Sequence, residues 1–327
     1  MSREPGFRNA LLAGLATLLV SAVSAHAQTA ATWPDRAVRL VVPYPPGGGT
    51  DTVTRVLAQK LSEAWKQPVL VDNRSGANGM AGTEVVAKAK PDGLTLGLVI
   101  AAHAINPSLY PQMPYKESEL QPVSLLAEYP FLVAVSATSE IHTLADLIEA
   151  ARKAPGTLMF ASSGSGSGPH LGTELFLAQT GIAMLHVPYR GAAPAQTALL
   201  GGHVQMFFSN LLAAAPQLRG ARIRVLAVTS AQRSPSLPDI PAVAESIPGF
   251  SVTGWYGLIA PAGVPAAIVD KVHEAAVAAV RDPEVVARLA GDGALPVGST
   301  PQEFRVRLKR ETAKWADVID AAGVKPE

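Results

Sequence analysis

Hydrophobic and polar positions in the first third of the chain follow two alternating patterns. Short apolar runs at residues 38–42, 68–72 and 94–100 are typical of buried strands. Between them, apolar residues at helical spacing from Val53 to Leu61, and a second segment at 81–89, predict two helices. This order predicts a parallel sheet with helices on its faces. All strand-to-helix loops of such a sheet lie at the edge where ligands bind.

The same alternation continues along the rest of the chain. Residues 102–107 are expected to form a polar turn, and prolines between 230 and 254 mark a long connection. About 300 residues exceed what one compact core usually holds, so two lobes are expected. Further strands are predicted at 131–136, 158–161, 182–187, 204–208, 223–228 and 254–261, and helices at 144–152, 170–179, 193–200 and from Ala266, Pro283 and Pro301 onwards. One lobe is expected to comprise 28–126 plus 225–327, and the other 127–224.

A glycine-rich loop at residues 43–51 joins the first predicted strand to the first predicted helix. Three prolines end the strand, Gly47 to Gly49 permit a close backbone approach, and Thr50 or Asp51 is expected to cap the helix. Free N–H groups and the positive end of the helix dipole favour an anion there. The P-loop lysine is missing, and Thr52 stands where the dinucleotide fingerprint needs glycine, so a small carboxylate is favoured over a nucleotide phosphate. A structural turn without a ligand is the alternative.

A second loop, at residues 162–168, lies between a predicted strand and a predicted helix and is rich in serine and glycine. A flexible linker is disfavoured because the segment is short and connects a strand directly to a helix. Two such loops predict two lobes that face one cleft. Neither loop contains Lys or Arg, so neutral donors and helix dipoles would hold the ligand, which favours a mono- or dicarboxylate. Arg74 and Arg190, in neighbouring loops, are the expected sources of any second countercharge.

The N-terminus and the charge balance indicate an exported protein. Arg3 and Arg8 precede an apolar run and then Ala25-His26-Ala27, so residues 1–27 are predicted to be a signal peptide cleaved after Ala27. A retained membrane anchor is the alternative. Without this leader, the 27 basic and 26 acidic residues fall to 25 of each, which argues against a nucleic-acid surface. With no cysteine for a disulfide or lipid, the mature chain is expected in a periplasm.

An enzymatic role is disfavoured by the motifs. A hydrolase using the serines at 162–167 would need G-x-S-x-G, but Gly166 stands where that serine belongs. His170 and Glu174 lie one helical turn apart, but a third metal ligand is not evident. A binding protein with no cofactor and no metal is therefore expected. A structural scaffold has no sequence repeat to support it.

A set of motifs in this order resembles the periplasmic substrate-binding proteins of tripartite tricarboxylate transporters, the Bug or TctC-like family. The motifs are residues 41–51, 71–79, 91–93, 106–110 and 255–263 and the pair Lys314-Trp315. The resemblance implies a two-lobed α/β fold of the type II, Venus flytrap kind. It also implies capture of a small organic anion for a membrane transporter. A monomer is expected. Gln205 departs from the family pattern, in which many members carry an acidic residue, so the identity of the ligand does not transfer.

The family places its ligand between the lobes, against the two glycine loops found above. Tyr44 is expected to form an aromatic wall, and Asn210 to face the cleft. His103 and His170 are included because both lie in predicted cleft loops. The candidate ligand-binding residues are Tyr44, Gly47, Gly48, Gly49, Thr50, Asp51, His103, Ser162, Ser163, Gly164, Ser165, Ser167, His170 and Asn210.

Overall fold

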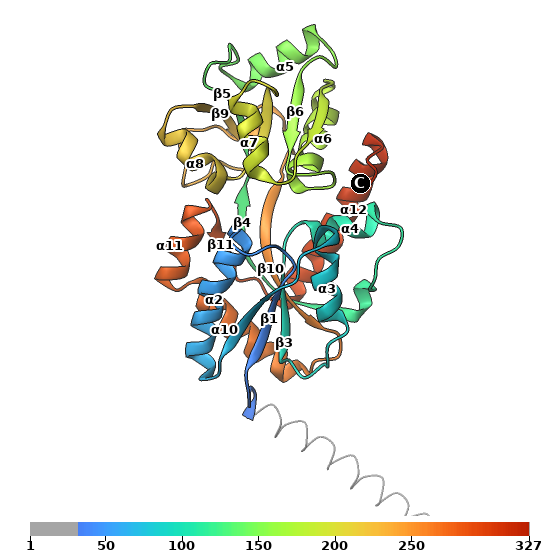
Figure 1. Cartoon of the computed structure of the whole chain (residues 1–327), viewed down its shortest axis with the longest axis vertical. Coiled ribbons are helices and arrows are strands. Elements are labelled where there is room, and N and C mark those ends of the chain that lie inside the picture. The colour runs from blue at the N-terminus through green and yellow to red at the C-terminus, as the bar shows by residue number, and fades with distance from the viewer. Residues whose placement is uncertain (1–31, 327) are drawn as a thin grey trace, which may run out of the picture.

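The computed structural model describes residues 32–326 and forms two lobes along its long axis, each built on one sheet (Figure 1). The sheet of the first lobe has the strand order β11-β4-β10-β3-β1-β2, and that of the second lobe β7-β6-β8-β5-β9. The first sheet contains β1 (Val38–Val42), β2 (Val69–Asn73), β3 (Thr95–Val99), β4 (Leu120–Pro130), β10 (Thr253–Pro261) and β11 (Leu295–Pro296). The second contains β5 (Leu132–Ser136), β6 (Met159–Ser162), β7 (Leu185–Pro188), β8 (Met206–Ser209) and β9 (Ile223–Val228).

Helices cover both sheets. The first lobe carries α2 (Gly49–Trp65), α3 (Met80–Ala87), α4 (Ala102–Leu109), α10 (Ala266–Val280), α11 (Pro283–Gly291), α12 (Pro301–Ala322) and the short η1 (Ala77–Gly79) and η2 (Glu117–Glu119). The second carries α5 (Leu144–Lys153), α6 (Gly168–Thr180), α7 (Ala192–Leu200), α8 (Leu211–Arg219) and α9 (Val243–Ser246). Strand β1 is continuously apolar because it lies inside the sheet, where Leu40 packs with Leu57 and Leu61 of α2 in one core. The predicted two-lobed α/β fold is confirmed.

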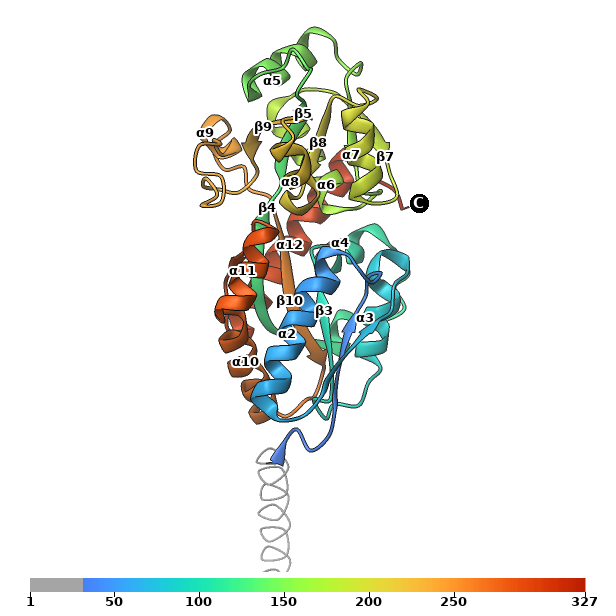
Figure 2. The same cartoon turned by 60° about the vertical axis from the view of Figure 1, so that its left-hand side comes forward.

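The two lobes are joined by two strand crossings and by α12. Strands β4 and β10 pair antiparallel from Leu120 opposite Pro261 to Pro130 opposite Thr253, and both lead into the second lobe. At the crossing, the Phe131 N–H donates to Thr229 Oγ1 (2.8 Å), and the Thr229 hydroxyl donates to the Val252 carbonyl (2.7 Å). Helix α12 packs against α4 and β4 of the first lobe and against α6 of the second. Figure 2 shows α12 running past the junction of the lobes.

The strand ends refine where the lobes divide. Residues 127–130 complete β4 of the first sheet, and residues 225–228 complete β9 of the second, so both sheets extend past the expected limits at 126/127 and 224/225. We propose that the lobes divide at Phe131 and Thr229, where the two crossings are hydrogen-bonded to each other. The predicted signal peptide lies outside the described residues. Within residues 32–326, no helix has both the length and the apolarity needed to cross a bilayer.

The segment at 102–107 forms helix α4, so the expectation of a polar turn was wrong. Its polar residue Asn106 is buried and exchanges hydrogen bonds with Asn78: Asn78 Nδ2 donates to Asn106 Oδ1 (2.8 Å), and Asn106 Nδ2 donates to the Asn78 carbonyl (3.1 Å). The helix is held by buried apolar residues such as Ile105, which offset the cost of Pro107 inside it. Tertiary packing thus overrides the local turn signals.

Candidate functional site

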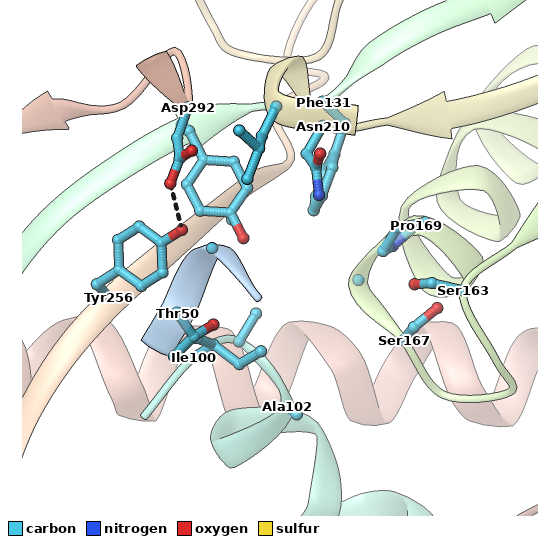
Figure 3. Close-up of a pocket in the computed structure, with 16 residues that line it drawn as sticks. Thr50, Ile100, Ala102, Phe131, Ser163, Ser167, Pro169, Asn210, Tyr256 and Asp292 are labelled. Atoms are coloured by element: carbon cyan, nitrogen blue, oxygen red, sulfur yellow. Dashed lines mark hydrogen bonds between the residues drawn. The ribbon is translucent and has the colours of Figure 1, made fainter. Parts of the chain in front are cut away.

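A cavity of about 200 Å³ lies between the lobes (Figure 3). Both lobes contribute to its wall, and the strand crossing contributes Tyr129 and Phe131. The lining residues are Gly49, Thr50, Ile100, Ala101, Ala102, Tyr129, Phe131, Ser163, Ser167, Gly168, Pro169, Asn210, Leu212, Gly254, Tyr256 and Asp292. Since neither Lys nor Arg is among them, a cationic side chain does not set the potential inside the cavity.

The N-termini of four helices meet at this cavity. Helices α2 and α4 follow β1 and β3 of the first sheet, and α6 and α8 follow β6 and β8 of the second. Each brings residues of its first turn or its N-cap to the cavity wall: Gly49 and Thr50, Ala101 and Ala102, Ser167 to Pro169, and Asn210 and Leu212. Backbone N–H groups at a helix start lack intrahelical acceptors and carry the positive end of the dipole. The cavity therefore favours an anion.

The first glycine loop is shaped by Asp51, which turns away from the ligand space. Its carboxylate accepts hydrogen bonds from the Gly47 N–H (2.9 Å), Asn73 Nδ2 (2.9 Å) and Arg55 Nε (3.0 Å). Burial raises the pKa of Asp51, but the hydrogen bonds, above all that from Arg55, outweigh burial and lower this pKa overall. The N-cap of α2 is Gly48, so the expectation that Thr50 or Asp51 caps the helix was wrong.

The three glycines of this loop have different reasons to be glycine. Gly47 has a φ of +86°, which favours glycine. Gly48 has a φ of −78°, and a Cβ there would meet only the Pro45 carbonyl at 3.9 Å. A Cβ at Gly49 would lie 3.3 Å from Leu212 Cδ2, 3.4 Å from Asp292 Oδ2 and 3.5 Å from Tyr256 Oη. Gly49 is therefore the glycine of this loop that keeps the cavity open.

The second loop presents two hydroxyl groups to the cavity, those of Ser163 and Ser167 (Figure 3). Ser167 Oγ also accepts the His170 N–H (3.4 Å) as the N-cap of α6. The Gly166 N–H donates to His170 Nδ1 (3.1 Å), so the buried imidazole of His170 fixes the backbone of this loop.

Ser162 and His186 support the same loop from the interior. Ser162 Oγ lies 2.6 Å from His186 Nε2, and the ring of His186 stacks on His170 with 3.7 Å between centroids. Burial, together with the neighbouring His170, lowers the pKa of His186 to about 4. Because Ser162 is fully buried, this serine–histidine contact does not face the cavity.

The opposite wall carries an aromatic and acidic group that the sequence did not indicate. The Tyr256 hydroxyl donates to Asp292 Oδ2 (3.1 Å), and the Tyr129 ring lies beside Tyr256 with 5.4 Å between centroids. Asp292 is only 3% exposed, and burial raises the pKa of its carboxyl group. A Cβ at Gly254 would lie 2.3 Å from the Tyr129 ring, so Gly254 makes room for this wall.

Five of the predicted site residues line the cavity: Gly49, Thr50, Ser163, Ser167 and Asn210. Asn210 Oδ1 accepts the Ala213 N–H (2.8 Å) as the N-cap of α8, and its amide points into the cavity (Figure 3). Tyr44 instead packs against Gly79, and His103 lies on a separate groove beside α12. The other predicted residues are in or next to the two loops but are not part of the cavity wall: Gly47, Gly48, Asp51, Ser162, Gly164, Ser165 and His170. Ligand contact stays a prediction for the whole set.

The structure adds residues that sequence reasoning missed. Ile100, Ala101 and Ala102 lie where β3 leads into α4, and the sequence had assigned Ala102 to a turn. Tyr256 lay within a motif of the resemblance, as part of residues 255–263, but no role was assigned to it. Asp292 follows α11 and precedes the two-residue strand β11, which is too short to leave a periodic pattern. Among the described residues, His, Asp and Glu form no cluster that could hold a metal ion.

Comparison with known proteins places this chain in one family. The model of the tripartite tricarboxylate transporter family receptor matches residues 53–324. Protein BugT of Bordetella pertussis is 37% identical over 319 residues, which cover 96% of this chain and 98% of BugT. The structure of R. palustris Rpa4515 with adipate has a TM-score of 0.80 and 38% identity, covering 90% of this chain and all of the other.

A further solved structure agrees. MatC from Rhodopseudomonas palustris, with bound malate, has a TM-score of 0.76 and 31% identity, covering 88% of this chain and 100% of MatC. The sequence motifs, the two-lobed fold and the matched family model all lead to the same assignment. The chain belongs to the tripartite tricarboxylate transporter receptor family, the TctC/Bug family of periplasmic solute-binding proteins.

Proposed function

We propose that this protein captures a small organic mono- or dicarboxylate in the cavity between its lobes and delivers it to the membrane components of a tripartite tricarboxylate transporter. The observation that carries the proposal is the meeting of four helix N-termini at a cavity without a cationic side chain. The related structures with adipate and with malate support a carboxylate as ligand. The predicted signal peptide supports action in the periplasm.

The strength of such a site can be bounded. A helix N-terminus contributes about 0.3 to 2 kcal/mol towards an anion, so four give about 1 to 8 kcal/mol. Micromolar affinity corresponds to about 8 kcal/mol and also has to cover the entropy lost on binding. Hydrogen bonds from Ser163, Ser167 and Asn210 to a charged oxygen add about 1.5 to 3 kcal/mol each. These neutral donors suffice for one or two carboxylates, whereas a third would lack a partner.

The position of the cavity also indicates how binding couples to motion. Ser163, Ser167 and Asn210 belong to the second lobe, and Thr50 and Ala102 to the first. A ligand that touches both groups gains contacts only when the lobes are together, so it favours the closed state. A closed, loaded form gives a membrane partner a shape that differs from the open form.

We propose no enzymatic activity. A hydrolase would need a serine beside a base at the cavity, but the Ser162–His186 contact is buried behind the loop. The lowered pKa of His186 also makes its imidazole a poor base.

A thermal-shift screen tests the function directly. The mature protein would be mixed with aliphatic and aromatic mono-, di- and tricarboxylates, and hits would be measured by calorimetry. Ligand at about one hundred times its Kd adds about 2.7 kcal/mol of stability, which a melting curve detects. Tight binding of citrate without a response to any mono- or dicarboxylate would contradict the proposed ligand class.

A further inference from the structure

The cavity has two chemically different ends. Ser163 and Ser167, in the loop between β6 and α6, lie on one side, and Asp292 with Tyr256 lies on the other (Figure 3). The first end offers hydroxyl donors, and Asn210 adds an amide beside it. The second end offers a carboxylate, which accepts hydrogen bonds when it is ionised. A molecule that is anionic throughout complements the first end alone.

One carboxylate oxygen of Asp292 has no hydrogen-bond donor in the described part of the chain. Asp292 Oδ2 accepts the Tyr256 hydroxyl (3.1 Å), but its Oδ1 is buried and accepts no hydrogen bond within residues 32–326. The side chain is 3% exposed and lines the cavity, so a group bound in the cavity can lie beside this carboxylate. Leaving a buried acceptor unsatisfied is costly, and a donor on a ligand would remove that cost.

The charges around Asp292 favour a donor over a second carboxylate. Arg288, one helical turn earlier, attracts this carboxylate, but the hydrogen bond that Asp292 accepts comes from the neutral Tyr256 hydroxyl. Asp292 Oδ2 also lies 3.4 Å from where a Cβ at Gly49 would stand, so this carboxylate lies beside the first residue of α2. A ligand carboxylate at this end would meet a like charge a few ångströms away. The cavity residues at the N-termini of α6 and α8 include no acidic side chain that would repel a ligand carboxylate.

We propose that Asp292 and Tyr256 form a donor-recognising subsite, so that the ligand carries a carboxylate at one end and a hydroxyl, amide N–H or ammonium group at the other. The carboxylate lies against Ser163, Ser167 and Asn210, and the donor binds Asp292. This inference rests on the proposed function, because it assumes that a carboxylate occupies the cavity. It narrows the substrate class to ω-hydroxy acids, ω-amino acids and acid amides.

Matched ligands of one skeleton test this subsite by calorimetry. The four-carbon set is butyrate, γ-hydroxybutyrate, γ-aminobutyrate and succinate, and the six-carbon set is hexanoate, ε-hydroxyhexanoate, ε-aminohexanoate and adipate. In at least one set, the wild-type protein is expected to bind the hydroxy or amino acid about tenfold more tightly than the dicarboxylate or the plain acid.

Two variants test whether the preference for a ligand with a donor group depends on Asp292. Asp292→Asn keeps the shape and removes the charge, so it is expected to lose the preference for the amino acid about tenfold and to gain affinity for the dicarboxylate. Asp270→Asn makes the same charge change on the exposed face of α10 and is expected to bind like wild type. Melting temperatures of both variants check that they fold.

The outcomes separate this inference from the proposed function. Binding of succinate or adipate by the wild type as tightly as the matching amino and hydroxy acids, with Asp292→Asn unchanged, would overturn the subsite and leave carboxylate capture standing. If Asp292→Asn does not fold, the wild-type ranking alone decides. If no member of either set binds and the wider carboxylate screen also gives no response, the proposed function and the subsite both fall.

Discussion

Replacing Gly49 by alanine would put a methyl group into the cavity without straining the backbone. Gly49 begins α2 and does not have a positive φ, so alanine can adopt its conformation. The new Cβ would lie 3.4 Å from Asp292 Oδ2 and 3.5 Å from Tyr256 Oη, and at 3.3 Å it would push on Leu212 Cδ2. Leu212 is 37% exposed, so its side chain can move aside.

The expected effects on stability and on affinity have opposite signs. Alanine is better than glycine inside a helix by about 0.5 to 1 kcal/mol, so unfolding should become no easier. The methyl group would take up space beside Asp292 and Tyr256 and keep the donor end of a ligand away from the Asp292 carboxylate. Losing one charge-assisted hydrogen bond costs about 1.5 to 3 kcal/mol, which weakens binding about 10- to 150-fold.

Gly48→Ala is the matched control. It makes the same chemical change one residue earlier, where the nearest atom to the new Cβ is 3.9 Å away. Its affinity should stay within about twofold of wild type, while its stability falls by about 0.5 to 1 kcal/mol because alanine is a poorer N-cap residue. Urea unfolding and calorimetry with the best carboxylate from the screen measure both quantities. Wild-type affinity in Gly49→Ala, or equal weakening in both variants, would refute the role given to Gly49.

Three more predictions concern pH, the crossing and lobe closure. Burial lowers the pKa of His103 to about 4, so between pH 4 and about pH 6.5 the unfolded state binds more protons than the folded state. The free energy of unfolding therefore falls by up to about 3 kcal/mol as the pH drops through this range. Urea unfolding should show a shallower dependence on pH for His103→Gln than for wild type, and equal slopes would contradict the assignment. Thr229→Val removes the hydroxyl between Phe131 and Val252, and should cost about 1 to 3 kcal/mol by urea unfolding, whereas an unchanged midpoint would exclude that role. Small-angle scattering should give a smaller radius of gyration at saturating ligand, and an identical profile would indicate a cavity that is already closed.

The sequence revealed those parts of the site that are local in the chain. The apolar strand β1, the glycine loop and α2 follow one another, so their pattern predicts both the structure and the anion preference. The same holds for β6, its serine loop and α6. Tyr129, Tyr256 and Asp292 come together only because β4 pairs with β10 and α11 turns back beside them. Their contacts depend on pairings between distant segments, which no local pattern records.

Helix α12 limits how far the two lobes can separate when no ligand is bound. Its residues Phe304, Trp315 and Ile319 are buried in a core that also includes Phe176 of the second lobe and Trp255 of the first. Together with the two strand crossings, this third tie leaves few directions in which the lobes can separate. An open form that is restricted in this way samples fewer lobe orientations, so closure on a ligand loses less conformational entropy. A cavity that binds through neutral donors can then hold its ligand, because little of the binding free energy is needed to offset the cost of lobe closure.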